Sequence, residues 1–326
     1  MSLPSGELGA EKGTGTLEGP GPRVFSDWYI SGGKLDLSTP AVMGIMNLTP
    51  DSFSDGGQLS SVAEALDRGC RLVEEGARIL DIGGESTRPG AGPVAVEEEL
   101  ERVLPFIQEA TKVGLGPLSI DTRNAAVARE SLRSGAQIVN DVSGLRHDPV
   151  MAQVVAQEGA GLVLSHMRGT PATMRELAEY DDVVAEVTQE LGASLSIAVD
   201  GGISKERIVV DPGIGFAKTG DQSLALLQDL ASFHALGCPI LVGPSRKSFI
   251  GEVTGLPPAE RLPGTIAACV LAFFSGARVF RVHDVAPIVQ ALGVTQAILE
   301  GCCGSGVRPR TGVLRMPDKE GRRMRC

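Results

Sequence analysis

Short apolar runs alternate with amphipathic stretches along most of the chain. The first clear run, residues 41–46, stops abruptly at the polar Asn47. Residues 62–73 follow with apolar side chains at helical spacing, and a second apolar run covers residues 78–82. Apolar runs of this length are typical of buried strands, and the amphipathic stretch between them is typical of a helix. The pattern therefore predicts a β-α-β unit.

The same alternation continues to residue 299. Further strands are predicted at 118–120, 137–139, 162–164, 208–210, 240–242 and 279–281, and further helices at 96–111, 125–134, 149–158, 183–199 and 284–299. Alternating strands and helices imply a parallel sheet. Eight strands within 326 residues suit closure better than an open sheet, since such barrels take about 250 residues. We predict the α/β class with a single (β/α)8 TIM barrel.

The two ends of the chain lack this alternation. Residues 1–22 are rich in Gly, Pro, Ser and Glu and lack the apolar core of a signal peptide, so a disordered tail is expected. Residues 301–326 are rich in Arg, Gly and Pro, and we expect a basic flexible tail that is either solvating or able to contact a partner. The barrel is assigned to residues 23–300, with a weakly stranded lead-in at 24–37.

Composition narrows the possible partners. The formal net charge of −10 opposes attraction to nucleic acid or an anionic membrane, so an anionic substrate must be held by locally placed cations. No uncharged apolar run reaches the roughly 18 residues that suggest a membrane span. The six cysteines show no metal-binding spacing and are expected to be reduced thiols. We expect a cytoplasmic protein with small-molecule substrates.

Polar residues follow nearly every predicted strand, at the end where barrels place their active sites. They are Asn47, the loop 83–90, Asp121, Asn140 with Asp141, His166, Asp211, Lys247, and Arg281 with His283. Polar groups that point into a barrel mouth are costly to desolvate unless they have partners. Their convergence predicts a site for a polar ligand with several hydrogen-bonding groups.

Carboxylates and an amide predict the ligand's chemistry. Asp121, Asn140 and Asp211 would satisfy a nitrogen-rich heterocycle with adjacent NH and NH2 groups. A guanidine-like edge, as in a pterin, can donate two hydrogen bonds to one carboxylate, and Asp211 is the candidate acceptor. The alternative is that Asp121 and Asp211 are helix N-caps, a common place for acidic residues.

Cations follow the last two predicted strands. Lys247, Arg281 and His283 would bind an anionic leaving group or a carboxylate, in the region where barrels often hold phosphate. The alternatives are an exposed charged helix start for Lys247 and a structural role for His283. The loops 47–57 and 83–90 are long enough to close over substrate or to be solvent-exposed turns, and Asn47 is a candidate oxygen ligand for a magnesium diphosphate.

No phosphate-binding loop, dinucleotide fingerprint or Ser/His/Asp constellation occurs, so kinases, dehydrogenases and serine hydrolases lack their usual signals. Two long strings, MGIMNLTPDSFSDGG at 43–57 and DIGGESTRPG at 81–90, resemble the two signatures of dihydropteroate synthases. Shorter matches are SIDT at 119–122, VND at 139–141, HMRG at 166–169, DPGIGF at 211–216, SRKSF at 245–249 and RVHD at 281–284. The resemblance covers residues 41–299.

The resemblance implies a transferase of folate synthesis that joins 6-hydroxymethyl-7,8-dihydropterin diphosphate to 4-aminobenzoate, uses Mg²⁺, is inhibited by sulfonamides and is usually a homodimer. The residues that it implies around the pterin are Asp121, Asn140, Asp211 and Lys247, with Met167 and Phe216 lining the site. Those implied at the magnesium diphosphate are Asn47, Arg281 and His283, and those around the aminobenzoate are Thr87, Arg88 and Ser248. Asp55 is implied to order the first loop.

The resemblance also implies that diphosphate leaves first and that Asp121 stabilises the cationic pterin methylene that remains. Asn47, Lys247, Arg281 and His283 complete the implied catalytic set. Two other functions stay open. A pterin-binding, corrinoid-linked methyltransferase shares the Asp, Asn and Asp pattern but does not require the SRK and RVH motifs, and a non-catalytic paralogue would bind pterin without turnover.

Overall fold

The computed structural model of the chain describes residues 26–49, 62–86, 90 and 92–300. The predicted tails at 1–22 and 301–326 lie outside these ranges. So do three of the predicted site residues, Asp55, Thr87 and Arg88.

Eight parallel strands form the centre of the fold. They are β3 (Ala41–Asn47), β4 (Ile79–Gly83), β5 (Leu118–Asp121), β6 (Ile138–Asp141), β7 (Gly161–Ser165), β8 (Ile208–Asp211), β9 (Leu241–Val242) and β10 (Val279–Val282). Their order is β8-β7-β6-β5-β4-β3-β10-β9, and a parallel bridge between Val210 and Ile240 joins the two outer strands. The sheet therefore closes on itself, which confirms the predicted (β/α)8 barrel.

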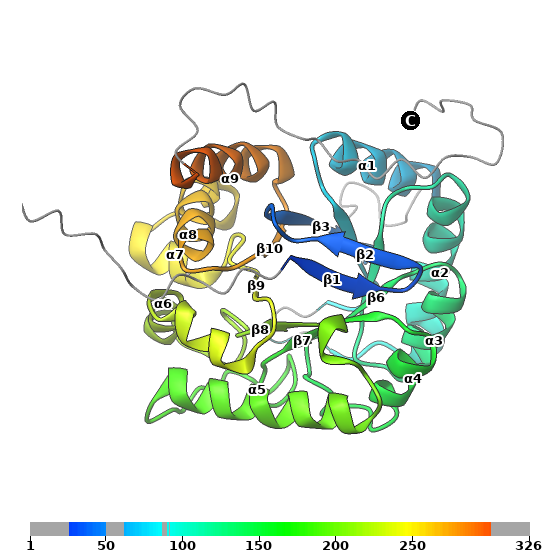
Figure 1. Cartoon of the computed structure of the whole chain (residues 1–326), viewed down its shortest axis with the longest axis horizontal. Helices are drawn as coiled ribbons and strands as arrows, with labels where there is room; N and C mark the ends of the chain where they lie inside the picture. The colour runs from blue at the N-terminus through cyan, green and yellow to red at the C-terminus, as the bar shows by residue number, and fades with distance from the viewer. Residues whose placement is uncertain (1–25, 50–61, 87–89, 91, 301–326) are drawn as a thin grey trace, which may run out of the picture.

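Helices surround the strands as an outer ring (Figure 1). They are α1 (Val62–Glu74), α2 (Val96–Lys112), α3 (Ala125–Arg133), α4 (Met151–Gln157), α5 (Val183–Asp200), α6 (Gly220–Gln228), α7 (Ser248–Thr254), α8 (Leu262–Phe274) and α9 (Val285–Leu299), with short 3-10 helices η2 (Lys205–Arg207), η3 (Leu230–Leu236) and η4 (Pro258–Glu260). Outward-facing strand residues such as Val42, Ile82 and Phe280 pack in the large core cluster beneath these helices. Both faces of each strand are thus covered, which explains the continuous apolar runs in the sequence.

The weakly stranded lead-in is an antiparallel hairpin, β1 (Asp27–Ile30) with β2 (Gly33–Asp36). Figure 1 shows it lying across one end of the barrel. Trp28 and Leu35 are fully buried and share a core cluster with the first inward-facing residues of the strands. The Trp28 indole also donates a hydrogen bond of 2.8 Å to the carbonyl oxygen of Arg207. The hairpin therefore plugs the amino-terminal end of the barrel.

The inward-facing positions change from apolar to polar along the barrel axis. Side chains on a strand alternate between the two faces, so residues two apart point the same way. Five strands accordingly carry an apolar residue in the cluster shared with the hairpin and a polar residue two positions later, namely Ile79 and Asp81, Ile138 and Asn140, Val163 and Ser165, Val209 and Asp211, and Val279 and Arg281. The polar layer of the site thus lies directly above a packed apolar layer.

Two further observations bear on the expectations from composition. Within the part of the chain that the structure describes, helices are too short or too polar to cross a membrane. Cys238 and Cys269 are buried free thiols.

The plug makes a stability prediction. Trp28→Ala removes a fully buried ring and should lower the free energy of unfolding by about 3–5 kcal/mol. Lys34→Ala, on the exposed side of the same hairpin, should leave the urea midpoint nearly unchanged because its ion pair with Asp27 is exposed to solvent. Comparable losses in both variants would show that the hairpin does not act through its buried face.

Candidate active site

An arginine between two carboxylates forms the centre of the barrel mouth. Arg281, on β10, donates from Nε to Asp81 Oδ2 and from Nη2 to Asp121 Oδ2, each at 2.6 Å. Asp81 lies on β4 and Asp121 on β5, and both side chains are buried. Burial alone disfavours the charged form of Arg281, but the two carboxylates outweigh it and raise its pKa above the ordinary value. The three residues form one fixed, charged unit.

Two carboxylate oxygens of this unit remain available. Asn140 donates from Nδ2 to Asp81 Oδ2 at 3.0 Å, so that oxygen is shared with Arg281. Oδ1 of Asp81 and Oδ1 of Asp121 are buried and have no hydrogen-bond partner among the described residues. Burial is the main cause that raises the pKa of Asp121, and Arg281 opposes it. An unpaired buried acceptor is costly, which points to a ligand with hydrogen-bond donors or positive charge.

Asp211 lies at the end of β8, on the same face of the barrel. Its Oδ1 accepts from the backbone N–H of Gly213 at 2.8 Å and its Oδ2 from the Ser165 hydroxyl at 3.2 Å. Burial raises its pKa, while the Gly213 N–H and Lys247 oppose the rise. Each carboxylate oxygen can accept about two hydrogen bonds, so both retain capacity for a ligand.

The alternative in which Asp121 and Asp211 cap helices is wrong. The N-cap of α3 is Asn124, and α6 begins with a capping box formed by Thr219 and Gln222. Asp141 does not join the site, however. Strand alternation turns it away from Asn140, and its carboxylate accepts hydrogen bonds from Ser143 and from the backbone of Leu145. Its role is to hold the turn that follows β6.

Lys247 and Phe216 meet at the barrel mouth. The Lys247 ammonium lies 3.6 Å from the centre of the Phe216 ring, a cation–π contact. Phe216 also packs in a small apolar cluster with Met167 and Met174, so the two residues predicted to line the pterin site are neighbours. Burial is the main cause that lowers the pKa of Lys247 to about 8, and the Arg281 cation adds to it. Lys247 is thus not the exposed, solvated cation of the alternative interpretation.

His283 and Ser245 extend the site beside Arg281. Ser245 Oγ accepts from the backbone N–H of His283 at 3.2 Å and lies 2.9 Å from His283 Nδ1. If the hydroxyl donates to Nδ1, the neutral ring carries its proton on Nε2, where it can serve an anion. Burial, with help from Arg281 and Arg246, lowers the pKa of His283 to about 3. The His283 ring is therefore neutral near pH 7.

Asn47, the predicted magnesium ligand, ends β3 at the same face. A Cβ added to Gly83 would lie 3.8 Å from Asn47 Oδ1 and 3.7 Å from Asp121 Oδ2, so the amide oxygen is close to the central carboxylates. The described residues contain no cluster of three His, Cys, Asp or Glu side chains suited to a metal. This arrangement fits Mg²⁺, which is usually held by one or two protein oxygens together with substrate phosphates and water.

The site residues predicted for the aminobenzoate are only partly described. Ser248 is exposed at the first position of α7, directly after Lys247. The base of the second loop is held by Glu85, which forms a buried ion pair with Arg123 and accepts from the backbone N–H of Val94.

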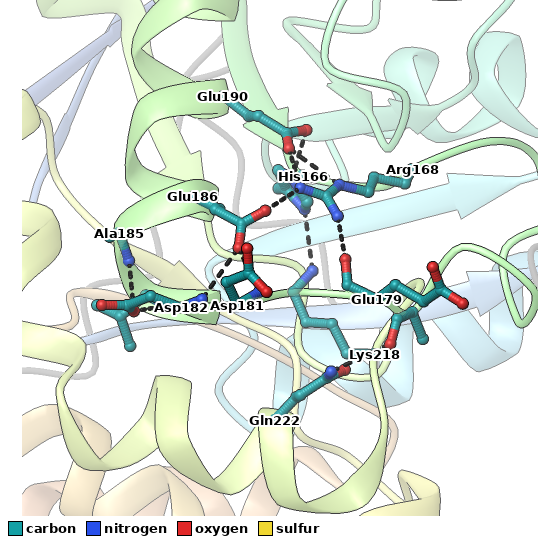
Figure 2. Close-up of polar contacts among 12 residues, drawn as sticks. His166, Arg168, Glu179, Asp181, Asp182, Ala185, Glu186, Glu190, Lys218 and Gln222 are labelled. Atoms are coloured by element: carbon teal, nitrogen blue, oxygen red, sulfur yellow. Dashed lines mark hydrogen bonds and ion pairs between the residues drawn. The ribbon is translucent and has the colours of Figure 1, made fainter.

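Two residues of the site were missed by the sequence analysis. Asp81 appeared there only as the first letter of a motif, although a carboxylate inside the apolar run 79–83 is itself a signal of a buried charge with a partner. Lys218 lies beyond the end of the matched string 211–216. It is buried and contacts His166 rather than solvent (Figure 2).

Comparisons with known proteins show which family the chain belongs to. The family model described as "Pterin binding enzyme" matches residues 43–283. The dihydropteroate synthase of Synechocystis sp. is 48% identical over 258 residues, which cover 79% of this chain and 89% of that protein. The Yersinia pestis dihydropteroate synthase structure with a sulfonamide drug complex has a TM-score of 0.80 and 40% identity, over 84% of this chain and 99% of that chain.

A second structure, the Xanthomonas albilineans dihydropteroate synthase with 4-aminobenzoic acid, has a TM-score of 0.78 and 46% identity, over 84% of this chain and 98% of that chain. The family model covers well over half of the chain, and the relatives match along nearly their whole length. The chain therefore belongs to the family of pterin-binding enzymes.

Proposed function

We propose that this chain is a transferase that condenses 6-hydroxymethyl-7,8-dihydropterin diphosphate with 4-aminobenzoate, giving 7,8-dihydropteroate and diphosphate in folate biosynthesis. The observation that carries the proposal is the pair formed by Arg281 and Asp121. The Arg281 guanidinium, which could bind an anion, lies beside the Asp121 carboxylate, whose buried Oδ1 has no hydrogen-bond partner within the described residues. This is the charge pattern needed where a diphosphate leaves a carbon that becomes positive.

The pterin ring is proposed to lie between β5, β6 and β8. Asp211 accepts from the ring's NH and NH2 groups, and Asn140 offers an amide oxygen while its Nδ2 is held by Asp81. Lys247 and Phe216 lie at the edge of the same region. A pterin bound there would present its exocyclic carbon to Asp121.

The diphosphate is proposed to bind between Arg281, His283 and Asn47. Arg281 is held in place by two carboxylates, so little side-chain freedom is lost when it binds an anion. Asn47 would help to hold Mg²⁺, and the bound ion would supply positive charge to offset that of the diphosphate. The Nε2–H group of His283 would donate a hydrogen bond to a phosphate oxygen.

The reaction needs no protein nucleophile. The bond between the pterin methylene carbon and the diphosphate oxygen breaks, and the electron pair leaves with the oxygen. The aryl amine nitrogen then forms the new bond to that carbon and loses one proton. Asp121 stabilises the positive charge on the pterin between these two steps, because its carboxylate is fixed and partly desolvated.

Purified protein would be incubated with both substrates and Mg²⁺, and dihydropteroate and diphosphate would be measured by chromatography. Both products should form together and in equal amounts, and EDTA should abolish them. Binding of pterin without turnover would favour the non-catalytic paralogue, and methyl transfer to cobalamin would favour the corrinoid-linked enzyme.

Asp121→Asn tests the role of the central carboxylate. The amide keeps the shape of the side chain and an oxygen for Arg281 but loses the negative charge. We expect kcat to fall by about 10²–10³-fold, as for loss of one preorganised electrostatic group, with smaller changes in either KM. Steady-state kinetics with each substrate varied would show this. A rise in KM with unchanged kcat would mean that Asp121 only binds substrate.

The pKa of Lys247 predicts an alkaline limit. Because burial lowers that pKa to about 8, the ammonium is charged below this pH and loses its proton as the pH rises through it. The value of kcat/KM for the pterin diphosphate should therefore fall above pH about 8. Lys247→Arg keeps its charge at that pH and should remove the alkaline limb, even if the overall rate is lower. An unchanged limb would assign the titration to another group.

We also propose that the protein is a homodimer formed through α8 and α9. These neighbouring helices contain no charged residue, yet they expose large apolar side chains on the outside of the barrel. Leu271 and Phe274 on α8 are each 65% exposed, and Val294 and Ile298 on α9 are 62% and 73% exposed. An uncharged apolar face of this kind is typical of a subunit interface, and a second copy of the chain supplies the matching surface.

The interface predicts a change of mass in solution. The double variant Leu271→Asp/Phe274→Asp should be a monomer by light scattering, because four charges would be buried in a symmetric dimer. Ile197→Asp, at a residue on α5 that is 47% exposed, is the matched control and should remain dimeric. A dimer in both variants would place the interface elsewhere.

A further inference from the structure

A chain of charged groups runs from the surface to the back of the pterin site. Figure 2 shows Lys218 pointing at the ring of His166, with Glu190 and Arg168 on the other side of that ring. The Lys218 ammonium lies 2.9 Å from His166 Nδ1 and donates at 2.9 Å to the carbonyl oxygen of Phe216. Lys218 is nearly fully buried, and the reaction described above does not use it.

The partners of His166 fix its protonation state. Nε2 lies 3.1 Å from Glu190 Oε2, and a carboxylate can only accept, so the ring N–H is on Nε2 and Nδ1 accepts from Lys218. Burial is the main cause that lowers the pKa of His166 to about 4, which keeps the ring neutral. Glu190 is in turn held by Arg168 and Arg146. Glu190 on α5 therefore holds the His166 ring in one orientation, and the ring in turn holds the Lys218 ammonium.

The backbone after β8 lies directly against His166. The N–H of His166 donates to the carbonyl oxygen of Asp211 at 3.0 Å. Gly213 has φ of 71°, and a Cβ added there would lie 1.9 Å from the carbonyl oxygen of His166. The segment that carries Asp211 and Phe216 thus packs closely against the end of β7. At the other end of this segment, Lys218 contacts the same histidine.

Lys218 is also placed to act on Asp211 by its charge. The charged groups that act on it are Asp211 from β8, Glu190 from α5, Lys247 before α7 and Arg168 after β7, with neutral His166 in direct contact. Burial is the main cause that lowers the pKa of Lys218 to about 7, so the ammonium is charged in acid solution. There it favours the ionised form of Asp211, the form that accepts hydrogen bonds from a pterin.

We propose that Lys218 is a positioning residue for the pterin: through His166 and the Phe216 carbonyl it holds the segment 211–216 in the geometry that binds the ring, and its charge supports the Asp211 carboxylate. This inference rests on the proposed function of the site. It concerns only pterin binding. Other residues would bind the aminobenzoate and the diphosphate leaving group.

Lys218→Met keeps the length of the side chain and removes the charge and both hydrogen bonds. We expect KM for the pterin diphosphate, and Kd for 6-hydroxymethylpterin by calorimetry, to rise about tenfold, as for loss of hydrogen bonds to a charged group. KM for 4-aminobenzoate should stay within about twofold, since Lys218 contacts only the pterin side. Equal increases in both KM values, or no increase in either, would overturn the proposal.

The pH profile separates positioning from a purely structural role. Without the Lys218 charge the pKa of Asp211 rises further, so the acid limb of kcat/KM for the pterin diphosphate should move to higher pH in Lys218→Met. Lys218→Arg keeps a cation and should return the limb toward that of the unaltered protein. An acid limb at the same pH in all three proteins would overturn the electrostatic part of the proposal.

Controls deal with stability and with the proposed function itself. Arg207→Met removes another cation that donates to backbone carbonyls, those of Ile30 and Gly159 near the plug, and should lower the melting temperature without changing either KM. If Lys218→Met does not fold, Glu190→Gln should give a smaller rise in the same KM, and no rise would overturn the proposal. Absence of turnover in the unaltered protein would refute the function, whereas normal turnover with an unaffected Lys218→Met would refute this inference alone.

Discussion

Charged groups buried in the barrel mouth are the constraint on which the site depends. Removing a carboxylate from water is costly, and Asp81, Asp121 and Asp211 are all buried within one face of the barrel. Arg281 offsets two of them, and Lys247 and Lys218 act on the third. The compensation is incomplete, because one oxygen of Asp121 has no partner within the described residues. A ligand that brings donors and a developing positive charge completes it.

The barrel supplies the rigidity that such an arrangement needs. Asp81, Asp211 and Arg281 each lie two residues beyond an apolar residue that packs with the hairpin, so this apolar layer fixes where these charged side chains begin along the barrel axis. The same strands bring together residues that are distant in sequence. Arg281 and Asp81 are 200 residues apart, and they become neighbours only because β10 pairs with β3 and β3 with β4. The pairing of β10 with β3, and of β3 with β4, is therefore a condition for assembly of the site.

Much of this could be predicted from the sequence, because the signals are local. Apolar runs marked the strands, and polar residues at their ends marked the site, including Asp121, Asp211 and Arg281. The partners of those residues could not be predicted in the same way. Asp81 lies inside an apolar run, and the contact of Lys218 with His166 spans 52 positions. The pairing of side chains across a barrel depends on strand register and on loop conformation. Neither can be predicted from one local segment of the sequence.

The central claim is that the mouth has two separate halves, one for the pterin ring at Asp211 and one for the diphosphate at Arg281. Calorimetric binding of 6-hydroxymethylpterin and of magnesium diphosphate, each alone, to the unaltered protein and to Asp211→Asn tests it most directly. The account predicts that the variant binds the pterin at least about tenfold more weakly, as expected when a charged acceptor is lost, and binds the diphosphate as before. Equal weakening of both ligands, or of the diphosphate alone, would contradict it.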